Sequence, residues 1–428
     1  MVHFGTFVPG IFVPIFLLAG TLQVGPGKPF ARLEDALKAA QPGDTIEVYP
    51  GARPYEKVAL FVTKANLTFR AVPAKKGERV RLSGDGFDYS GSGSTPRAVF
   101  QFNKGADGCV VEGFEISGAH NGSHNGAAVR INQANHVTIR DCDIHDNDMG
   151  VMSNGDGTAA SAVNQRIERC LIHHNGTDQD PGFNHNLYLG GASVTLSGCE
   201  VHHSLTGHNV KSRAHHTRVE YSCIHDSANR EFDLVDADET ALPESHAVLV
   251  GNLIVKAKGM SGNKTVIHFG QDGGKEHDGT ITLAHNTIVT PYVSPIVELD
   301  APKARAHFVG NIVWDAGAKQ KGKLAASKGD PAAVTGAHNW LSPAFDFKET
   351  RLESSKTWSG ADPGFADASK HDYRPTAAGL ADVGPRDLKL PEGPGMKPDP
   401  PLAWQYKHPA SLEKRKSDRK PDLGAVER

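Results

Sequence analysis

Cysteine is scarce in this sequence of 428 residues, and its charges almost cancel. The five cysteines do not form the close CxxC pairs that a zinc site of that type requires. Lysine and arginine number 46 against 49 aspartates and glutamates, so a net charge of -3 gives no general attraction to nucleic acid or to anionic membranes. We therefore expect no nucleic-acid partner, and any anion must bind at a local patch.

Long hydrophobic runs are also lacking, except at the start of the chain. Residues 1–20 are apolar, end in small residues and are interrupted by Pro9 and Pro14. A stretch this short and broken resembles a secretory signal peptide, although lysine and arginine are missing from its beginning. The alternative is a membrane anchor. We expect residues 1–20 to be a signal peptide, the protein to be secreted, and no other segment to cross a membrane.

The chain contains an internal repeat. Copies such as VTIRDCDIHDN (137–147) and TRVEYSCIHDS (217–227) place two apolar residues five positions apart. The second of these residues marks each copy, at Ile144, Ile172, Val201, Ile224, Ile254, Ile288 and Val313. Neighbouring markers are as close as 23 residues (201 to 224) and as distant as 34 (254 to 288). Short strands repeated at such a period, with variable insertions, predict an all-β solenoid, a right-handed parallel β-helix.

A small or amide residue stands two positions before each marker. These residues are Cys142, Cys170, Cys199, Ser222, Asn252, Asn286 and Asn311. Their fixed place in the repeat predicts an internal ladder at one bend of successive coils, about 4.8 Å apart. A disulfide framework is the alternative for the cysteines, and we favour free buried thiols.

Both ends of such a solenoid need a cover, because the last strand edges are otherwise unpaired. Near the start, Leu33, Ala36, Leu37 and Ala40 fall on one face of a short predicted helix. We therefore expect a parallel β-helix with an N-terminal capping helix over residues 21–316. Residues 317–428 are rich in proline, lysine and aspartate, and we expect the last coils and an irregular C-terminal segment there.

After each marker strand the chain loops and enters another strand, and alternation turns the middle residue of that strand outward. Stacked coils then present an outward column made of Arg130, Met152, Tyr188, Lys211, Asp233, His268 and Glu298. Polar residues flank this column on three adjacent coils, namely His185, Asn186, His208, Asn209, Arg213, Arg230 and Glu231. Acids, bases and cations that converge in this way predict a functional groove.

A second set of histidines follows the markers directly. His145, His173, His202 and His225 recur at the same place in four coils. We interpret them as a structural stack at a turn. A metal-binding face is the alternative, because stacked imidazoles can bind transition metals.

The segment VGPGKPF with ALKAAQPGDTIEVYPG, the coil repeats, and the tail motifs DPGF (362–365), DYRP (372–375) and PDLGAVE (421–427) resemble secreted bacterial right-handed β-helix proteins of the pectate-lyase-like superfamily. That resemblance implies an enzyme that cleaves or epimerises acidic polysaccharides. The stretch VKSR (210–213) is similar to the strand that carries the lysine base of chondroitinase-B and alginate-lyase-type enzymes, which implies that role for Lys211.

A lyase of this kind must neutralise a uronate carboxylate, remove the proton next to it and protonate the leaving oxygen. We expect Arg213 and Arg230 to bind the carboxylate. Two bases stay open: Lys211, or His208 with Tyr188 as the acid. Because a free lysine has a pKa of about 10.4, Lys211 needs neighbouring cations to lower its pKa, while Asp233 opposes them.

The sequence departs from the calcium-dependent relatives. LTGHN stands where an acidic pair is expected before Lys211, and Asp233 stands where an arginine is expected. Calcium therefore stays open as a cofactor, but the acidic ligands expected for it are not evident in the sequence. Asp233 with Glu231 or Glu298 could instead form a hydrolase pair. Uronate epimerisation, or carbohydrate binding without catalysis, are further alternatives; the groove has few aromatic rings, which favours an enzyme. We expect a monomer that acts on an acidic polysaccharide.

Overall fold

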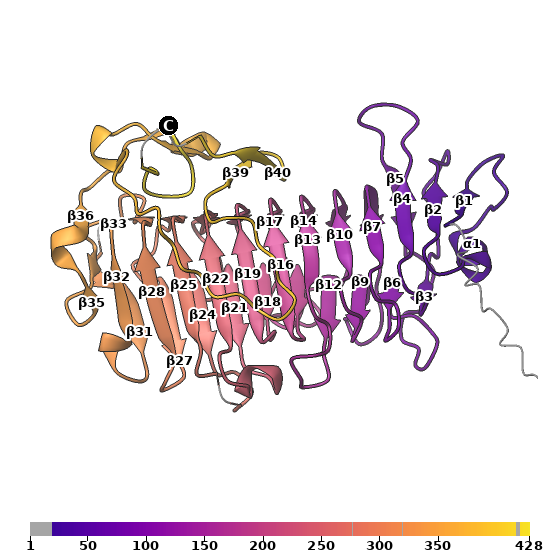
Figure 1. The fold of residues 1–428 in the computed structure, drawn as a ribbon, viewed down its shortest axis with the longest axis horizontal. Coiled ribbons are helices and arrows are strands. Elements are labelled where there is room, and N and C mark those ends of the chain that lie inside the picture. Colours follow the sequence, from indigo (N-terminus) through magenta and orange to yellow (C-terminus); the bar gives the residue numbers. More distant parts are fainter. Residues whose placement is uncertain (1–18, 276, 319, 417–419) are drawn as a thin grey trace, which may run out of the picture.

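A computed structural model describes residues 19–275, 277–318, 320–416 and 420–428. The predicted signal peptide therefore lies almost wholly outside the described residues. In the described part the chain winds into a parallel β-helix whose coils stack along one long axis (Figure 1). No helix among these residues is both long enough and apolar enough to cross a membrane.

Each coil contributes one strand to each of three parallel sheets, here named A, B and C, which have 13, 11 and 10 strands in the described residues. Sheet A contains β1 (Thr21–Val24), β2 (Thr45–Val48), β4 (Thr68–Ala71), β7 (Val110–Glu112), β10 (Thr138–Arg140), β13 (Gln165–Glu168), β16 (Ser193–Ser197), β19 (His216–Glu220), β22 (His246–Val250), β25 (Thr280–Ala284), β28 (Arg305–Val309), β32 (Val334–Ala337) and β35 (Arg351–Leu352).

Sheet B contains the marker strands. Its members are β5 (Val80–Ser83), β8 (Phe114–Ser117), β11 (Asp143–His145), β14 (Leu171–His173), β17 (Glu200–His202), β20 (Cys223–His225), β23 (Leu253–Val255), β26 (Thr287–Val289), β29 (Ile312–Trp314), β33 (Asn339–Leu341) and β36 (Thr357–Ser359). The markers from Ile144 to Val313 are in register from coil to coil, which confirms the predicted repeat.

Sheet C carries the predicted groove. Its members are β3 (Leu60–Val62), β6 (Ala98–Phe102), β9 (Ala127–Asn132), β12 (Met149–Asn154), β15 (Leu187–Leu189), β18 (Val210–Ser212), β21 (Phe232–Val235), β24 (Ile267–Gly270), β27 (Val297–Asp300) and β31 (Ala325–Ser327).

Shorter elements lie outside the three sheets. The two-stranded sheets are formed by β30 (Gly322–Lys323) with β34 (Phe345–Asp346), β37 (Phe365–Asp367) with β38 (Asp372–Pro375), and β39 (Trp404–Lys407) with β40 (Ser411–Lys414). The 3-10 helices are η1 (Glu239–Ala241), η2 (Pro331–Ala333), η3 (Ser354–Lys356), η4 (Ala368–Lys370) and η5 (Ala378–Leu380).

The N-terminal cap is α1 (Leu33–Ala39), as the sequence predicts. Leu33, Ala36 and Ala40 are buried, and Leu37 packs against the same core. This apolar face covers the open end of the first coils, where unpaired strand edges would otherwise meet water.

The inside of the coils is apolar, and a polar ladder runs through it. The Asn252 amide donates to Asn286 (3.0 Å), Asn286 to Asn311 (3.1 Å) and Asn311 to Asn339 (3.0 Å). All five cysteines, each within the described residues, are free and buried, as predicted. The thiols of Cys170 and Cys199 donate to backbone carbonyls of the preceding coil. The ladder is therefore continuous through amides, while the thiols bond to the backbone.

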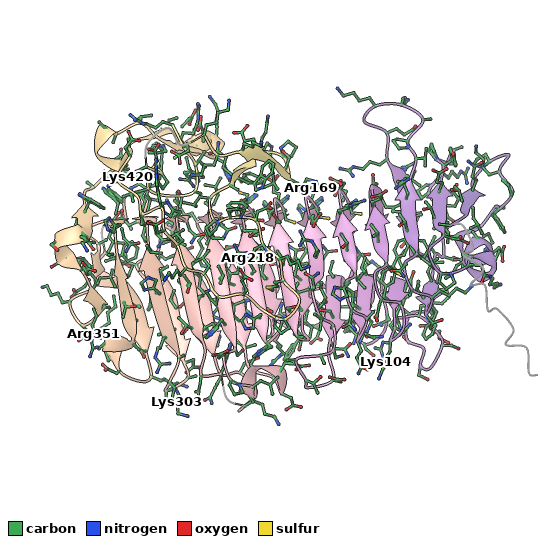
Figure 2. The ribbon with its side chains drawn as sticks, viewed as in Figure 1. Lys104, Arg169, Arg218, Lys303, Arg351 and Lys420 are labelled. Atoms are coloured by element: carbon green, nitrogen blue, oxygen red, sulfur yellow. The ribbon has the colours of Figure 1, made fainter. Side chains whose placement is uncertain are left out.

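The last part of the chain returns over sheets A and B. We name residues 360–428 the C-terminal segment; Figure 1 shows its yellow ribbon crossing several strands of the helix. Leu402 N–H donates to the hydroxyl of Tyr221 (2.9 Å), and Ala425 N–H donates to Thr287 (3.1 Å). Arg218, labelled in Figure 2, is an outward residue of β19 and yet is only 2 % exposed. The C-terminal segment therefore covers part of the solenoid wall.

Candidate active site

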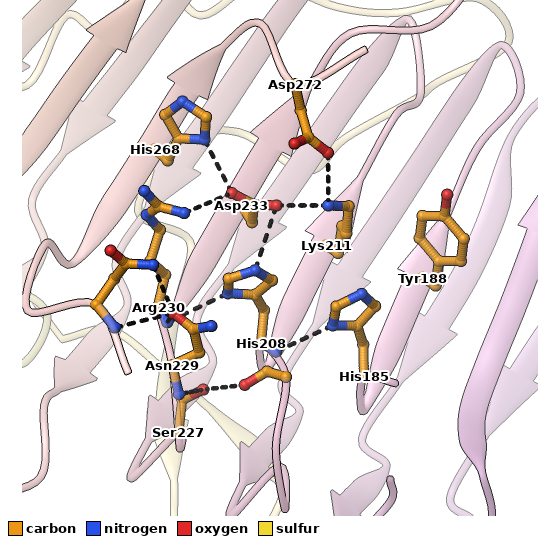
Figure 3. Close-up of polar contacts among 12 residues, drawn as sticks. His185, Tyr188, His208, Lys211, Ser227, Asn229, Arg230, Asp233, His268 and Asp272 are labelled. Carbon is orange, nitrogen blue, oxygen red and sulfur yellow. Dashed lines mark hydrogen bonds and ion pairs between the residues drawn. The ribbon is translucent and has the colours of Figure 1, made fainter. Parts of the chain in front are cut away.

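The outward column of sheet C forms as predicted. Successive coils place Arg130, Met152, Tyr188, Lys211, Asp233, His268 and Glu298 in register. Figure 3 shows Tyr188, Lys211, Asp233 and His268 along this row. The column forms because each of these residues is the outward position of a short strand between two buried residues.

Asp233 is the hub of the column. Its carboxylate is 3.4 Å from the Nε2 atom of His208 and accepts hydrogen bonds from Lys211 Nζ (2.8 Å) and His268 (2.9 Å). Arg230 Nη1 lies 3.4 Å away. Burial alone would raise the pKa of Asp233, but His268, His208 and Lys211 hold it well below its usual range. Asp233 is therefore a fixed negative charge and does not supply a proton.

Lys211 is held as an ammonium ion. It donates to Asp233 and also to Asp272 (2.9 Å). Burial would lower the pKa of Lys211, but the two carboxylates outweigh it and raise that pKa. The expectation that Arg213 and Arg230 lower the pKa of Lys211 is therefore wrong. Both arginines contact the same carboxylates as the lysine, Arg213 at Asp272 and Arg230 at Asp233, and the carboxylates still determine the direction of the pKa shift of Lys211.

His208 is neutral and carries its proton on Nε2. Its Nδ1 accepts the backbone N–H of Arg230 (3.2 Å), and a neutral imidazole has one N–H only. Burial lowers the pKa of His208 to about 4. The same arrangement recurs one coil earlier, where His185 Nδ1 accepts the N–H of His208 (3.0 Å) and the two rings stack. With Nε2 protonated and directed at Asp233, His208 is a hydrogen-bond donor and not the proton acceptor.

Tyr188 and Arg213 form the second half of the site. Arg213 Nε donates to the hydroxyl oxygen of Tyr188 (3.1 Å), and Nη2 donates to Asp272 (2.8 Å). Asp272 therefore bridges Lys211 and Arg213 (Figure 3 draws its bond to Lys211). A guanidinium directed at a phenolic oxygen stabilises negative charge on that oxygen during a reaction.

The sequence did not predict Asp272, because the loops between sheets C and A, one of which carries it, differ in length and sequence from coil to coil. Asp236 fixes this loop: its carboxylate accepts the backbone N–H groups of Asp272 (2.5 Å), Gly273 (2.7 Å) and Lys275. Burial would raise the pKa of Asp236, but these three bonds lower it. The sequence pattern that could have indicated Asp272 is weak. It consists of an aspartate after β21 and a DGG turn after β24.

A cavity of about 760 Å³ adjoins this cluster. Its lining includes Arg130, Tyr188, Arg213, Glu239 and Lys275. Arg130 donates to Asn132 (3.2 Å) and to the sulfur of Met152 (3.2 Å), and among the described residues it forms no ion pair. An arginine without a carboxylate partner at the wall of a cavity is suited to an anionic ligand.

Three residues predicted to contact substrate lie elsewhere. Asn186, Asn209 and Glu231 are fully buried. The Asn186 amide donates to Asn209 (2.9 Å), and Asn209 donates to Glu231 (2.6 Å). The predicted outward orientation is wrong for these three, because they precede the strand at the bend of the coil, where side chains turn inward to satisfy backbone groups. Burial raises the pKa of Glu231 to about 7, and this carboxyl cannot pair with Asp233 in the groove.

At the Glu298 end of the column, the charged side chains form ion pairs with one another. Arg230 Nη2 lies 3.4 Å from Glu298, so Arg230 joins Glu298 to Asp233 across two coils. The second ring nitrogen of His268 lies 3.5 Å from Asp300. Arg230 is thereby occupied by two carboxylates, unlike Arg130 at the other end.

The groove does not fit calcium. Calcium requires six to eight oxygen ligands. The carboxylates nearest the centre, Asp233 and Asp272, are each bonded to Lys211, and one further cation contacts each of them. A divalent cation there would be repelled by the ammonium and guanidinium groups, so we derive no step through calcium.

The histidine column on sheet B stacks as predicted. Ring centroids of His145, His173, His202 and His225 follow one another at 5.1, 4.9 and 4.8 Å. The residue after each of them has a left-handed backbone, for example His174 with φ 52° and His203 with φ 48°. The stack therefore lies at a turn of each coil.

Comparison with known proteins agrees with this architecture. The family described as right-handed β-helix region matches residues 127–313. The described residues form a right-handed parallel β-helix, as the description of this family says.

Among solved structures it is similar to the pectate lyase Pel9A, at 13% identity and a TM-score of 0.54, with 96% of each chain covered. An alginate lyase from Paenibacillus sp. str. FPU-7 aligns at 16% identity and a TM-score of 0.48, over 79% of this chain and 99% of that one. The pectin methylesterase from Aspergillus niger aligns at 13% identity and a TM-score of 0.32, over 85% and 91%. No curated protein sequence matches the chain. At these identities the similarity shows the fold alone.

Proposed function

We propose that this protein is a secreted enzyme that cleaves an acidic, uronate-containing polysaccharide by β-elimination. One observation carries the proposal: Tyr188 and Lys211, two groups able to transfer protons, are in register on adjacent coils, and Tyr188 and the Arg213 bonded to it line a cavity. The fold shared with a pectate lyase is consistent with this reaction.

The geometry assigns the roles differently from the lysine-base scheme. Lys211 is protonated at rest, so it can give a proton but cannot take one. We assign it to the leaving oxygen. Tyr188 is assigned to remove the proton next to the uronate carboxylate: it acts as the phenolate, which the Arg213 N–H stabilises, and ends the step as the phenol. Arg213 and the unpaired Arg130 neutralise that carboxylate, and the products are a chain with a new alcohol and a chain with an unsaturated end.

Removing either proton-transfer group tests the proposal. Wild type incubated with a panel of uronate polysaccharides is expected to release unsaturated ends that absorb ultraviolet light. We expect Tyr188→Phe and Lys211→Ala each to lower kcat/KM by about 100- to 10,000-fold, the usual contribution of general acid–base catalysis. Tyr292→Phe is the matched control, because the Tyr292 hydroxyl contacts Gly259 and lines a different cavity.

Three outcomes contradict the proposal. New reducing ends without unsaturated product would indicate hydrolysis. Polymer binding without either product would indicate a carbohydrate-binding protein. Retained activity in Tyr188→Phe together with a normal thermal midpoint would remove the tyrosine from the mechanism.

A further inference from the structure

The histidine column on sheet B ends differently from the way it begins. His145 and His173 are half-buried on the solenoid wall, whereas His225 is only 7 % exposed and contacts the C-terminal segment. His371 of that segment approaches His225 edge-on, with ring centroids 5.2 Å apart. Side chains from coils and from the C-terminal segment therefore meet at this point, on a different sheet from the proposed active site.

These side chains are donors that bind transition metals. The ligand atoms of Cys223, His225 and His371 all lie within 4.8 Å of one another. Glu200 Oε1 lies 3.3 Å from His225 Nε2. Two ligands of one tetrahedral zinc ion are about 3.4 Å apart, given zinc–ligand bonds of about 2.0–2.3 Å. The Glu200–His225 pair already has this separation, and Cys223 and His371 must move towards it from within the 4.8 Å spacing of their group.

His225 is also oriented as a metal ligand would be. Its Nδ1 pairs with Asp226 (2.8 Å), so Nε2 is left facing Glu200. A carboxylate on the far nitrogen of a histidine is a recurrent second partner in zinc sites, where it fixes the ring and strengthens the ligand.

The cluster is accessible and lacks a free cation. Its members Glu200, Cys223, His225 and His371 line a cavity of about 490 Å³. The other basic residues at its wall already have carboxylate partners: Lys370 pairs with Asp367 (3.0 Å), Arg374 pairs with Asp372 (2.5 Å), and His408 Nδ1 lies 3.1 Å from Glu200. Glu200 and Asp226 thus place two carboxylates beside sulfur and nitrogen donors, a set that suits a divalent ion of intermediate softness.

We propose that Glu200, Cys223, His225 and His371 bind one divalent transition-metal ion of the zinc class. The ion joins β17 and β20 to the C-terminal segment. Cys223 is the one cysteine placed for this, because it faces outward into the cavity whereas Cys142, Cys170 and Cys199 bond to backbone carbonyls inside the coils.

Metal titration of the full chain tests the site. After dialysis against a chelator, the protein is titrated with Zn²⁺ against a chromogenic zinc indicator, and with Ca²⁺ as the comparison ion. We expect one tightly bound zinc per chain, no matching calcium binding, and a higher thermal midpoint with zinc. Cobalt(II) is expected to give the absorption band of a thiolate–metal bond.

Single substitutions then distinguish a specific zinc site from unspecific zinc binding by the stacked histidines. His371→Ala removes an exposed ligand with little risk to folding, and we expect it to weaken zinc binding at least 10-fold and to abolish the thermal shift. Cys223→Ser is expected to remove the cobalt band. His173→Ala is the matched control, because His173 belongs to the same stack without contacting the C-terminal segment.

The proposal would be overturned if the titration of the wild-type protein showed no saturable binding of one zinc ion per chain. Equal binding by His371→Ala would also overturn it, as would an equal loss in His173→Ala, which would mean that the stack binds metal unspecifically. A cobalt complex without the thiolate band would exclude Cys223 as a ligand.

Discussion

At the scale of single residues, Asp233 controls the protonation of its neighbours. It is buried and contacts Lys211, His208, Arg230 and His268 at once. Its negative charge contributes to the raised pKa of Lys211 and therefore keeps the proposed proton donor charged. The residue need not touch substrate to matter, because it acts through Lys211 as a positioning residue.

Removing that charge while keeping the shape should move the pH dependence of the reaction. In Asp233→Asn the pKa of Lys211 falls, so Lys211 loses its proton at a lower pH. We expect the alkaline limb of kcat/KM to shift to lower pH by about one unit or more, the scale that a nearby opposite charge produces. Profiles of kcat/KM against pH for wild type and variant measure the shift.

Glu298→Gln is the control for this shift, because Glu298 pairs with Arg230 and not with Lys211. An alkaline limb that moves equally in both variants would contradict a specific role for Asp233. An unchanged limb in Asp233→Asn would mean that Lys211 is not the titrating acid.

At the scale of elements, the asparagine ladder connects one coil to the next. The Asn286 amide donates to Asn311 and to the carbonyl of Leu249 (2.8 Å), and its oxygen accepts from Asn252. These groups lie where water cannot replace them. The ladder therefore satisfies a bend of the backbone that three adjacent coils share.

Breaking one rung should cost more than removing a buried thiol. We expect Asn286→Ala to lower the free energy of unfolding by about 2–4 kcal/mol, since several buried groups lose partners. Cys170→Ala is the matched control at the same place of another coil, where the weak thiol contacts with the carbonyls of Ile139 and Glu168 are lost, and about 1 kcal/mol is expected. Urea unfolding of both variants measures the difference; equal losses would mean that the amides act only as space-filling groups.

The elements also show what the sequence could predict. The markers and the outward column followed from the apolar alternation, because a register shift of one residue would expose the core. The alternation did not predict the orientation of Asn186, Asn209 and Glu231. These residues lie at a bend, where side chains turn inward to form hydrogen bonds with backbone groups and do not follow the alternation of strands. Asp272 and Asp236 lie in loops between sheets C and A whose length and sequence differ from coil to coil, so the repeat does not indicate their position. The metal cluster joins Cys223 to His371, almost 150 residues apart in the chain, and no local pattern reports such a contact.

At the scale of the whole molecule, the C-terminal segment is fixed by a buried arginine. Arg415 pairs with Glu427 (2.5 Å) and donates to the carbonyls of Asp422 (3.1 Å), Gly424 and Ala425. Its side chain is 1% exposed. This one guanidinium therefore holds the final turn of the chain in the shape that packs on sheets A and B.

Loss of this arginine should loosen the segment as a unit. Arg415→Ala leaves Glu427 and three carbonyls without their donor, and we expect a loss of about 3–5 kcal/mol, the range for breaking a buried ion pair. Arg374→Ala is the control in the same segment, where an exposed pair with Asp372 is worth about 0–1 kcal/mol. Thermal unfolding measures both, and a similar small change in the two variants would contradict an anchoring role for Arg415.

The covering of the middle coils by the last residues has a consequence for the order of folding during synthesis. Each coil can stack on the previous one as it leaves the ribosome, because its contacts are with the neighbouring coil. The wall around Thr287 and Tyr221, however, receives its partners Ala425 and Leu402 only after more than a hundred further residues have been made. When the solenoid of the nascent protein is nearly complete, this wall is therefore still uncovered. The C-terminal segment stabilises the wall only when it docks there, at the end of synthesis.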